Sequence, residues 1–221
     1  ENAGPVLEPI NLDKKNNFNS TEKFLDKLSP VFQTIDLLRQ HKKKKTLIGF
    51  CGSPFTVLTY MIEGKTSKDH FSTKVAMRKK KRQIDHLLNK LIEYSIAYLE
   101  RQIESGADII QIFESWAGVP NEEQYENVIV KPNKTIVKTI KKKYPEKKII
   151  CFTKGNQKHL LSFLNEVPCD VISTQAIEDQ RIIDFCKKNK VAVQGNLDPI
   201  DLYVGGKDLE KNEDEESVVI E

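Results

Sequence analysis

The chain has 221 residues, of which 38% are hydrophobic and 30% charged, a balance that excludes a fully disordered protein and permits a hydrophobic core. No apolar run approaches the roughly eighteen residues that a transmembrane helix needs. The formal net charge of +3 arises from 35 basic and 32 acidic side chains, which is too close to balance to indicate nucleic-acid binding.

The chain opens with an irregular segment and two helical patterns. Residues 1–19 carry Pro, Asn and Lys without periodicity, so we expect a loop-like N-terminal end. Residues 22–41 show two short helical patterns, and the second restarts at Pro30, which a first helical turn tolerates. The apolar run at residues 47–51 then predicts a buried strand, and residues 54–62 predict the helix that follows it.

Four more apolar runs alternate with helical patterns over the rest of the chain. The predicted strands lie at residues 108–113, 148–152, 170–173 and 191–194. The predicted helices lie at residues 83–105, 121–143, 156–166 and 178–189. Gly106 is placed to end the longest helix, and Pro132 is expected to break or restart the next one. Residues 207–221 are expected to form a charged C-terminal end.

This alternation predicts an α/β fold with a parallel sheet. Continuous apolar strands are typical of parallel sheets covered on both faces, and the connections suit right-handed crossover helices. Both a doubly wound sheet and a (β/α)8 barrel fit the pattern. No glycine-rich phosphate-binding motif follows the first predicted strand, which weakens a nucleotide-binding interpretation.

The four cysteines do not indicate a metal site. They form no Cys-x-x-Cys pair and no cluster with His at zinc spacing, so we expect buried free thiols and no metal. The four are Cys51, Cys151, Cys169 and Cys186.

Candidate site residues follow the predicted strands, because both candidate folds build their sites at the carboxyl ends of strands. The candidates are Phe50, Gly52, Tyr60, Phe113 and Ser115. Each has a simpler structural explanation when taken alone: a glycine can make a tight turn, a loop serine can cap the backbone, and aromatic rings can fill a core. No Ser-His-Asp arrangement or Gly-x-Ser-x-Gly motif is evident.

Taken together, the segments around these residues resemble the uroporphyrinogen decarboxylase family. The segments that carry the resemblance are 48–64 (IGFCGSPFTVLTYMIEG), 111–118 (QIFESWAG), 152–155 (FTKG) and 194–199 (QGNLDP). They occur in the family's order, each at a predicted strand end, and the resemblance extends over nearly the whole chain.

The resemblance implies a (β/α)8 barrel, a homodimer when complete, and a lyase of haem biosynthesis. The reaction would remove carbon dioxide from the four acetate arms of uroporphyrinogen III to give coproporphyrinogen III, without a metal or organic cofactor. The five predicted strands would be strands three to seven of the barrel, so the chain would be an internal piece of the enzyme. The family is usually cytoplasmic, with plastids as an alternative.

The resemblance also implies roles for the candidate residues. Tyr60 and Ser115 would make polar contacts with the substrate near the reacting arm. Phe50 and Phe113 would form apolar walls of the cleft, and Gly52 would let the backbone approach the macrocycle closely.

The chain departs from the family pattern in several places. The family's Arg-Gln-Ala-Gly-Arg-Tyr, Phe-Ser-Asp-Ile and Gly-His-Gly segments, which supply its arginines, aspartate and histidine, do not occur here. Lys65-Thr66 replaces a glycine run, and Gln175-Ala176 stands where the family has Asp-Trp. We therefore assign no catalytic residue in this chain and expect these 221 residues alone to be inactive.

Two other functions remain open at this stage. One is a non-catalytic homologue that binds porphyrins. The other is the related group of cobalamin-dependent methyltransferases, which share the barrel and bind zinc through a His-x-Cys arrangement. Ile149 occupies the position two residues before Cys151, where that arrangement needs a His.

Overall fold

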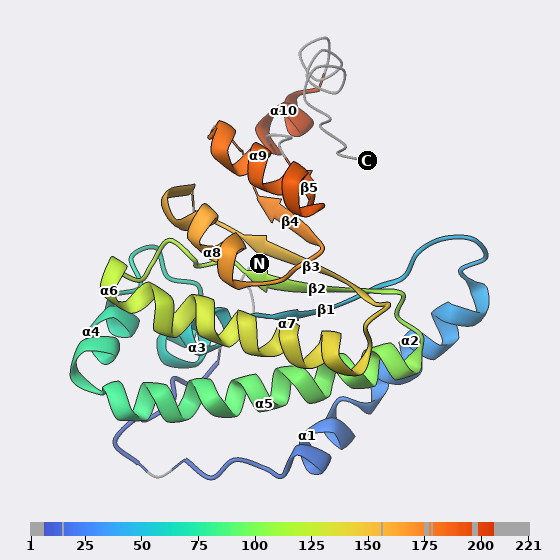
Figure 1. Ribbon diagram of the computed structural model, residues 1–221. Helices are drawn as coiled ribbons and strands as arrows, with labels where there is room; N and C mark the ends of the chain where they lie inside the picture. Colours follow the sequence, from blue (N-terminus) through green and yellow to red (C-terminus); the bar gives the residue numbers. More distant parts are fainter. Residues whose placement is uncertain are drawn as a thin grey trace.

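The structure is a computed structural model, and it describes residues 7–14, 16–155, 157–174, 177, 179–195 and 199–205. Within these ranges five strands alternate with helices along the chain (Figure 1). None of the helices in the same ranges is both long and apolar enough to cross a membrane. The predicted C-terminal end at residues 207–221 lies outside the described residues.

The five strands form one parallel sheet. They are β1 (Ile48–Gly52), β2 (Ile109–Glu114), β3 (Lys148–Thr153), β4 (Val171–Thr174) and β5 (Ala192–Gly195). Their spatial order follows the chain from β1 to β5, and each neighbouring pair is parallel. Each predicted strand is confirmed, starting at most one residue later and ending one residue later than expected. A doubly wound sheet has a point where the strand order reverses. The described sheet has no such point.

Helices precede, connect and follow the strands. They are α1 (Thr21–Lys27), α2 (Ser29–His41), α3 (Pro54–Glu63), α4 (Phe71–Lys79), α5 (Lys81–Ser105), α6 (Glu122–Tyr125), α7 (Lys131–Lys143), α8 (Leu160–Glu166), α9 (Gln180–Asn189) and α10 (Pro199–Val204). Two short helical turns, η1 (Glu126–Val130) and η2 (Gln157–His159), precede α7 and α8. Helix α4 was not predicted, because its buried side chains are few and include the polar Thr73.

Proline and glycine set several helix ends as expected. Pro30 lies in the first turn of α2, and Gly106, at φ +115°, ends α5 in the left-handed conformation. Pro132 lies in the first turn of α7, so the helix restarts there, which is one of the two expected outcomes. The π-helical η1 directly precedes α7, and the N–H of Lys131 bonds there to the C=O of Glu126.

The N-terminal segment is irregular where it is described. Residues 7–14 and 16–19 form neither helix nor strand. The N–H of Leu7 donates to the C=O of Gly64 at 2.8 Å, and the N–H of Ile10 donates to Met61 at 2.7 Å. These two bonds hold the segment against the end of α3, so part of the expected loop is anchored to the helical layer.

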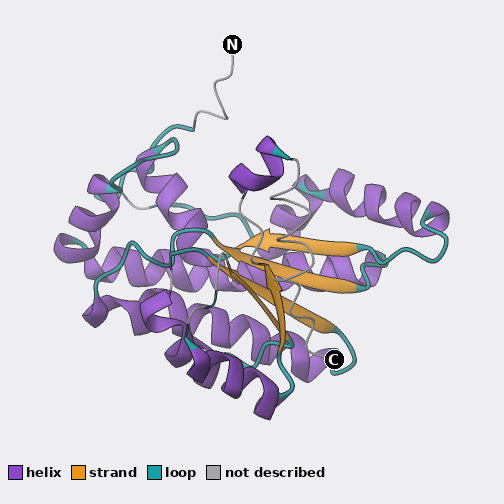
Figure 2. Ribbon diagram, turned by 90° about the horizontal axis from the view of Figure 1, so that it is seen from above, coloured by secondary structure: helices purple, strands orange, loops and turns teal. Residues whose placement is uncertain are grey.

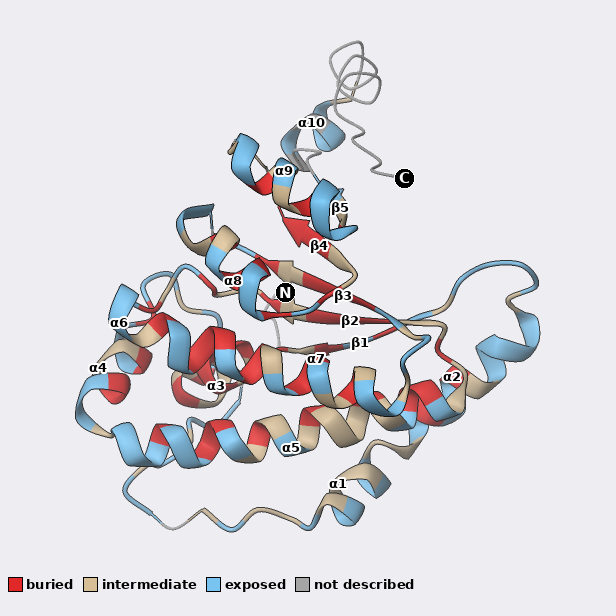
Figure 3. Ribbon diagram, in the orientation of Figure 1, coloured by how far each residue is buried: buried red, intermediate tan, exposed pale blue. Residues whose placement is uncertain are grey.

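The two faces of the sheet are covered unequally. Successive strand residues point to opposite faces, and the register aligns residues of one face across the strands. One face packs against helices, α3 and α5 among them, and its side chains are almost fully buried, such as Ile110 and Ile149 at 0% exposure (Figures 1 and 3). We call the opposite side the open face; it includes Phe50, Phe113 and Phe152.

The open face differs from the coverage on both faces that the apolar runs led us to expect. On it Phe50 is 58% exposed and Ile48 is 42% exposed. Figure 2 shows the strands as a twisted layer with helices flanking it. Within the described residues, one face of the sheet thus lies in a helix-packed core, whereas the other is exposed along β1 and buried at Gln111, Ile150 and Ser173.

The free edge of β1 is closed at one residue by a side chain. The Oε1 of Gln102 on α5 accepts from the N–H of Phe50 at 2.9 Å, and its Nε2 donates to the C=O of Phe50 at 3.0 Å. Gln102 is 2% exposed, so both ends of its amide are paired in a buried position. The beginning of the open face is thereby fixed to the helical layer.

We predict that Gly49→Ala destabilises the fold more than Gly52→Ala. A Cβ at Gly49 would lie 2.8 Å from the Oε1 of Gln102 and 3.0 Å from the Cβ of Ala107. Relieving this overlap should cost about 1–3 kcal/mol of unfolding free energy. A Cβ at Gly52 meets only the Cγ2 of Val57 within 3.1 Å, so that variant is the matched control. Urea unfolding followed by circular dichroism measures both; equal midpoints would contradict the prediction.

Candidate functional site

The candidate site lies where β1, β2 and β3 end. Gly52 pairs with Phe113, and Glu114 pairs with Thr153, so the carboxyl ends of the three strands are level with one another. The N–H of Ser53 extends this ladder by donating to the C=O of Phe113 at 2.9 Å. The parallel register alone therefore gathers residues that are far apart in the sequence.

Aromatic rings line the open face beside these strand ends. The rings of Phe50 and Phe113 meet edge to face with centroids 5.7 Å apart, and Phe113 and Phe152 are 5.6 Å apart. Such contacts fix ring orientation as well as burying apolar area. The structure thus brings together the two predicted wall residues, Phe50 and Phe113, and adds Phe152, which was not singled out as a candidate.

Tyr60 belongs to a second aromatic group. Its ring centroid lies 6.4 Å from that of Trp116, and the ring centroid of His70 lies 4.4 Å from that of Trp116. Among the ring contacts of the described residues, Tyr60 meets Trp116 rather than Phe50 or Phe113. Because Trp116 directly follows Ser115, this group connects helix α3 to the loop after β2.

His70 is a buried residue that the sequence reasoning missed. It is 3% exposed, adopts φ +52° ahead of α4, and neither ring nitrogen has a hydrogen-bond partner among the described residues. Burial lowers the pKa of His70 below its usual value, with the carboxylate of Glu63 opposing the shift. The imidazole of His70 thus packs on the indole of Trp116 in a buried position, and no local sequence pattern signals it.

A buried hydrogen-bonded chain lies directly behind Ser115. The Oγ1 of Thr56 on α3 donates to the Oε1 of Glu114 at 2.7 Å. The same hydroxyl oxygen accepts from the backbone N–H of Ser115 at 2.9 Å. Glu114 is 1% exposed and Thr56 is 6% exposed, so solvent does not compete for these bonds. Thr56 and Glu114 lie within the resembling segments, but neither was singled out as a site residue.

Glu114 is poised to titrate near neutral pH. Burial raises the pKa of Glu114 to about 7, while the hydrogen bond from Thr56 opposes the shift. Its Oε2 has no hydrogen-bond partner among the described residues, and neither does the Oγ1 of Thr153, its partner in the strand register. A carboxyl in this setting favours its protonated form.

The cysteines show the environment of buried free thiols. Cys51, Cys151, Cys169 and Cys186 are all free and buried. Burial raises the pKa of Cys51 to about 12 and that of Cys186 to about 11, which suppresses the reactive thiolate. No group of three or more His, Cys, Asp or Glu side chains within the described ranges lies close enough to hold a metal ion.

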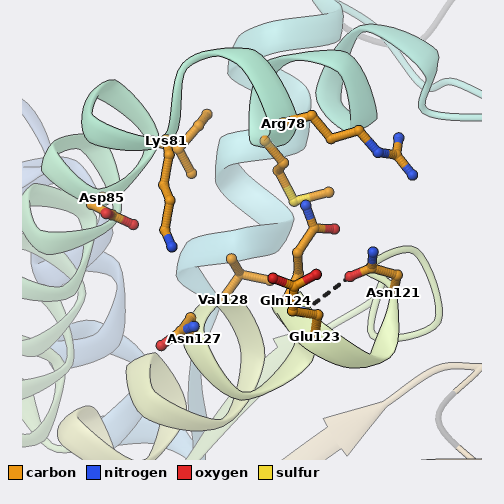
Figure 4. A pocket seen from close by; sticks show the side chains of 10 residues that line it. Arg78, Lys81, Asp85, Asn121, Glu123, Gln124, Asn127 and Val128 are labelled. Carbon is orange, nitrogen blue, oxygen red and sulfur yellow. Dashed lines mark hydrogen bonds between the residues drawn. The ribbon is translucent and has the colours of Figure 1, made fainter.

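A separate hollow of about 440 Å³ lies on the outer helices (Figure 4). It is lined by Met77, Arg78, Lys81, Ile84, Asp85, Asn121, Glu123, Gln124, Asn127 and Val128. Figure 4 shows Lys81 and Asp85 on one side of it and Glu123 and Asn127 on the other. Cations and anions are mixed around its wall, so its electrostatics favour no single class of ligand.

Comparison with known proteins identifies similar sequences over nearly the whole chain. The family model described as Uroporphyrinogen decarboxylase (URO-D) matches residues 1–215. A uroporphyrinogen decarboxylase from Rickettsia bellii (strain RML369-C) is 41% identical over 217 residues, covering 94% of this chain and 61% of that protein. One from Agrobacterium fabrum (strain C58 / ATCC 33970) is 35% identical, covering 95% of this chain and 61% of that protein. The chain thus spans about three fifths of the length of these curated relatives.

A solved structure shares the fold. A methyltransferase from Methanosarcina mazei superposes with a TM-score of 0.65 over 83% of this chain and 52% of that chain. The two sequences are 19% identical, so the likeness concerns the arrangement of the backbone alone.

We predict that Glu114→Gln makes the protein relatively more stable as pH rises. Wild-type Glu114 binds a proton more tightly when folded, so its contribution is fully present below its ordinary pKa of 4.5 and is lost as pH rises to about 7. The difference in unfolding free energy between variant and wild type should therefore grow by roughly 3 kcal/mol from about pH 4 to about pH 8. Urea unfolding at several pH values measures it, with the exposed Glu123→Gln as control; a pH-independent difference would contradict the prediction.

Proposed function

The chain belongs to the uroporphyrinogen decarboxylase family, and from this premise we propose that it is part of an enzyme that decarboxylates uroporphyrinogen III. The product would be coproporphyrinogen III, an intermediate of haem biosynthesis. The observation that carries the proposal is the open face itself. It sets aromatic walls from Phe50 and Phe113 beside the strand ends that present Gly52 and Ser115.

We propose that the five strands are part of a (β/α)8 barrel and correspond to its strands three to seven. Their sequential parallel order and the helices packed on one face support this, because a barrel closes with helices outside and strand side chains inside. The open face would then be the inner side of the barrel. The remaining strands would come from the rest of a longer polypeptide, since the relatives are longer than this chain.

The open face offers surfaces suited to a tetrapyrrole. Phe50, 58% exposed, and Phe113 present flat apolar groups on which pyrrole rings can pack. Gly52 has no side chain on this face, and only Val57 comes within 3.4 Å of where a Cβ would lie, so the macrocycle can approach the backbone. Tyr60 and Ser115 would supply hydroxyl groups to the acetate or pyrrole groups of the substrate.

In this proposal the decarboxylation proceeds without a metal or organic cofactor. Protonation of the ring carbon next to the one that bears an acetate arm makes the pyrrole an electron sink, because the cation is then conjugated with the arm-bearing carbon. The bond between the arm and its carboxylate then breaks, carbon dioxide leaves, and the electron pair neutralises the ring. Protonation of the remaining methylene carbon gives a methyl group, and loss of the proton first added to the ring carbon restores the aromatic pyrrole, so one proton is consumed for each carbon dioxide released. The protein must therefore orient the arm, deliver protons and stabilise positive charge on the ring.

The complete protein is proposed to be a homodimer in the cytoplasm, or in a plastid where haem synthesis occurs there. The family resemblance supports the dimer and the location. The methyltransferase likeness supports only the shared fold. The substrate, the partner subunit and the location are thus proposals for the whole protein rather than for these residues alone.

We predict that Tyr60→Phe in the complete polypeptide lowers kcat/KM for coproporphyrinogen formation by about 10- to 100-fold, because one hydrogen bond to a charged substrate is lost. The fold should be kept, since only a hydroxyl is removed. Tyr144→Phe is the matched control, because its hydroxyl bonds to Glu104 at 3.0 Å away from the strand ends of the site. Wild-type kinetics for Tyr60→Phe would remove Tyr60 from the site.

We also predict that a purified polypeptide of residues 1–221 produces no coproporphyrinogen. The family's arginine, aspartate and histidine segments are not in it, and part of the inner face is uncovered. Its unpaired strand edges should make it prone to aggregation. Chromatographic detection of product after incubation with uroporphyrinogen III measures this, and clear turnover would overturn the expectation.

A further inference from the structure

We propose that Glu114 is a positioning residue for the loop that carries Ser115, and that it acts through the hydroxyl of Thr56. The inference rests on the proposed function only for what Ser115 does with substrate. The hydrogen-bonded chain itself stands on geometry: 2.9 Å from the N–H of Ser115 to Thr56, and 2.7 Å from Thr56 to Glu114.

The direction of the chain is fixed by its first member. A backbone N–H can only donate, so the Oγ1 of Thr56 must accept from Ser115. A hydroxyl has a single proton, and that proton is therefore available for one acceptor, the Oε1 of Glu114. Removal of this acceptor leaves the Thr56 hydroxyl free to rotate, and the Ser115 N–H then loses its fixed partner.

The position of Ser115 explains why its backbone needs such a partner. Strand β2 ends at Glu114, and Ser115 is the first residue beyond it. The other half of the same peptide group, the C=O of Glu114, accepts from the N–H of Lys154 at 3.0 Å. Inside the sheet, a backbone N–H donates to a carbonyl of the neighbouring strand. At Ser115 the hydroxyl of Thr56, on helix α3, accepts this hydrogen bond instead.

Burial makes Glu114 suited to positioning rather than to contact with substrate. Its side chain lies on the helix-packed side, opposite the open face, because it alternates with Phe113. It is 1% exposed and lies beside the fully buried Ser53 and Thr153. A rigid, enclosed carboxyl one residue from a substrate-facing serine can set the loop without touching the substrate.

The two polar positions allow matched variants. Thr56→Val removes the hydroxyl at nearly constant volume, whereas Thr56→Ser keeps it. Glu114→Leu removes both oxygens, whereas Glu114→Gln keeps an acceptor for Thr56. Hydrogen exchange of the Ser115 amide reports its hydrogen bond directly, and it needs no substrate.

We expect Thr56→Val and Glu114→Leu each to speed exchange of the Ser115 amide by roughly tenfold or more relative to wild type. Thr56→Ser and Glu114→Gln should stay within about threefold. The proposal is overturned if Thr56→Val leaves the exchange rate at the wild-type value, or if Glu114→Gln behaves like Glu114→Leu. If Thr56→Val does not fold, the comparison of Glu114→Leu with Glu114→Gln tests the proposal without it.

Kinetics of the complete enzyme separate positioning from a general structural role. Thr56→Val should lower kcat/KM about tenfold in the wild-type background, but should cause no further loss when Ser115→Ala is already present. Losses that multiply would contradict action through Ser115. If the wild-type enzyme does not decarboxylate uroporphyrinogen III, the proposed function fails, while the exchange experiment still decides the positioning role.

Discussion

The candidate site residues that lie on strands take their positions from the residue-by-residue pairing of β1, β2 and β3. Gly52, Phe113 and Phe152 share one row across the sheet, and Glu114 and Thr153 share the next. Because successive residues point to opposite faces, the first row meets the open side and the second meets the helices. A slip of one residue would exchange the rows, placing a carboxyl on the open face and a phenyl ring in the polar cluster behind it.

The two rows therefore serve different purposes at the same strand ends. The open row is apolar and accessible, which suits a large flat ligand. The row behind it is polar yet almost fully enclosed, with Glu114 at 1% and Thr153 at 0% exposure. Burying a carboxyl that is only partly hydrogen-bonded does not favour folding. The packing of the surrounding helices offsets this unfavourable free energy. The buried carboxyl in turn holds the backbone of the following loop in one arrangement.

The sequence predicts what depends on local pattern. Apolar runs locate all five strands, and glycine and proline mark the ends of α2 and α5. Pairings distant in sequence escape such reasoning, since Thr56 and Glu114 are 58 residues apart and no periodicity links them. The sequence led us to expect both faces of the sheet to be covered, whereas one face is open along β1. A continuous apolar strand has the same sequence pattern whether its second face is covered by helices or by other strands. The roles of Tyr60 and Ser115 in substrate binding stay predictions.

The segments that carry the family resemblance are also the segments that the hydrogen-bonded chain of Thr56, Glu114 and Ser115 connects. The two longest resembling segments, 48–64 and 111–118, are widely separated in the sequence. In the structure they are joined by the bonds of Thr56 to Glu114 and Ser115, and by the N–H of Ser53 to the C=O of Phe113. A residue in one segment therefore constrains what can stand in the other, because each supplies the missing partner of the other's backbone or side chain. Together the two segments build one hydrogen-bonded platform at the strand ends.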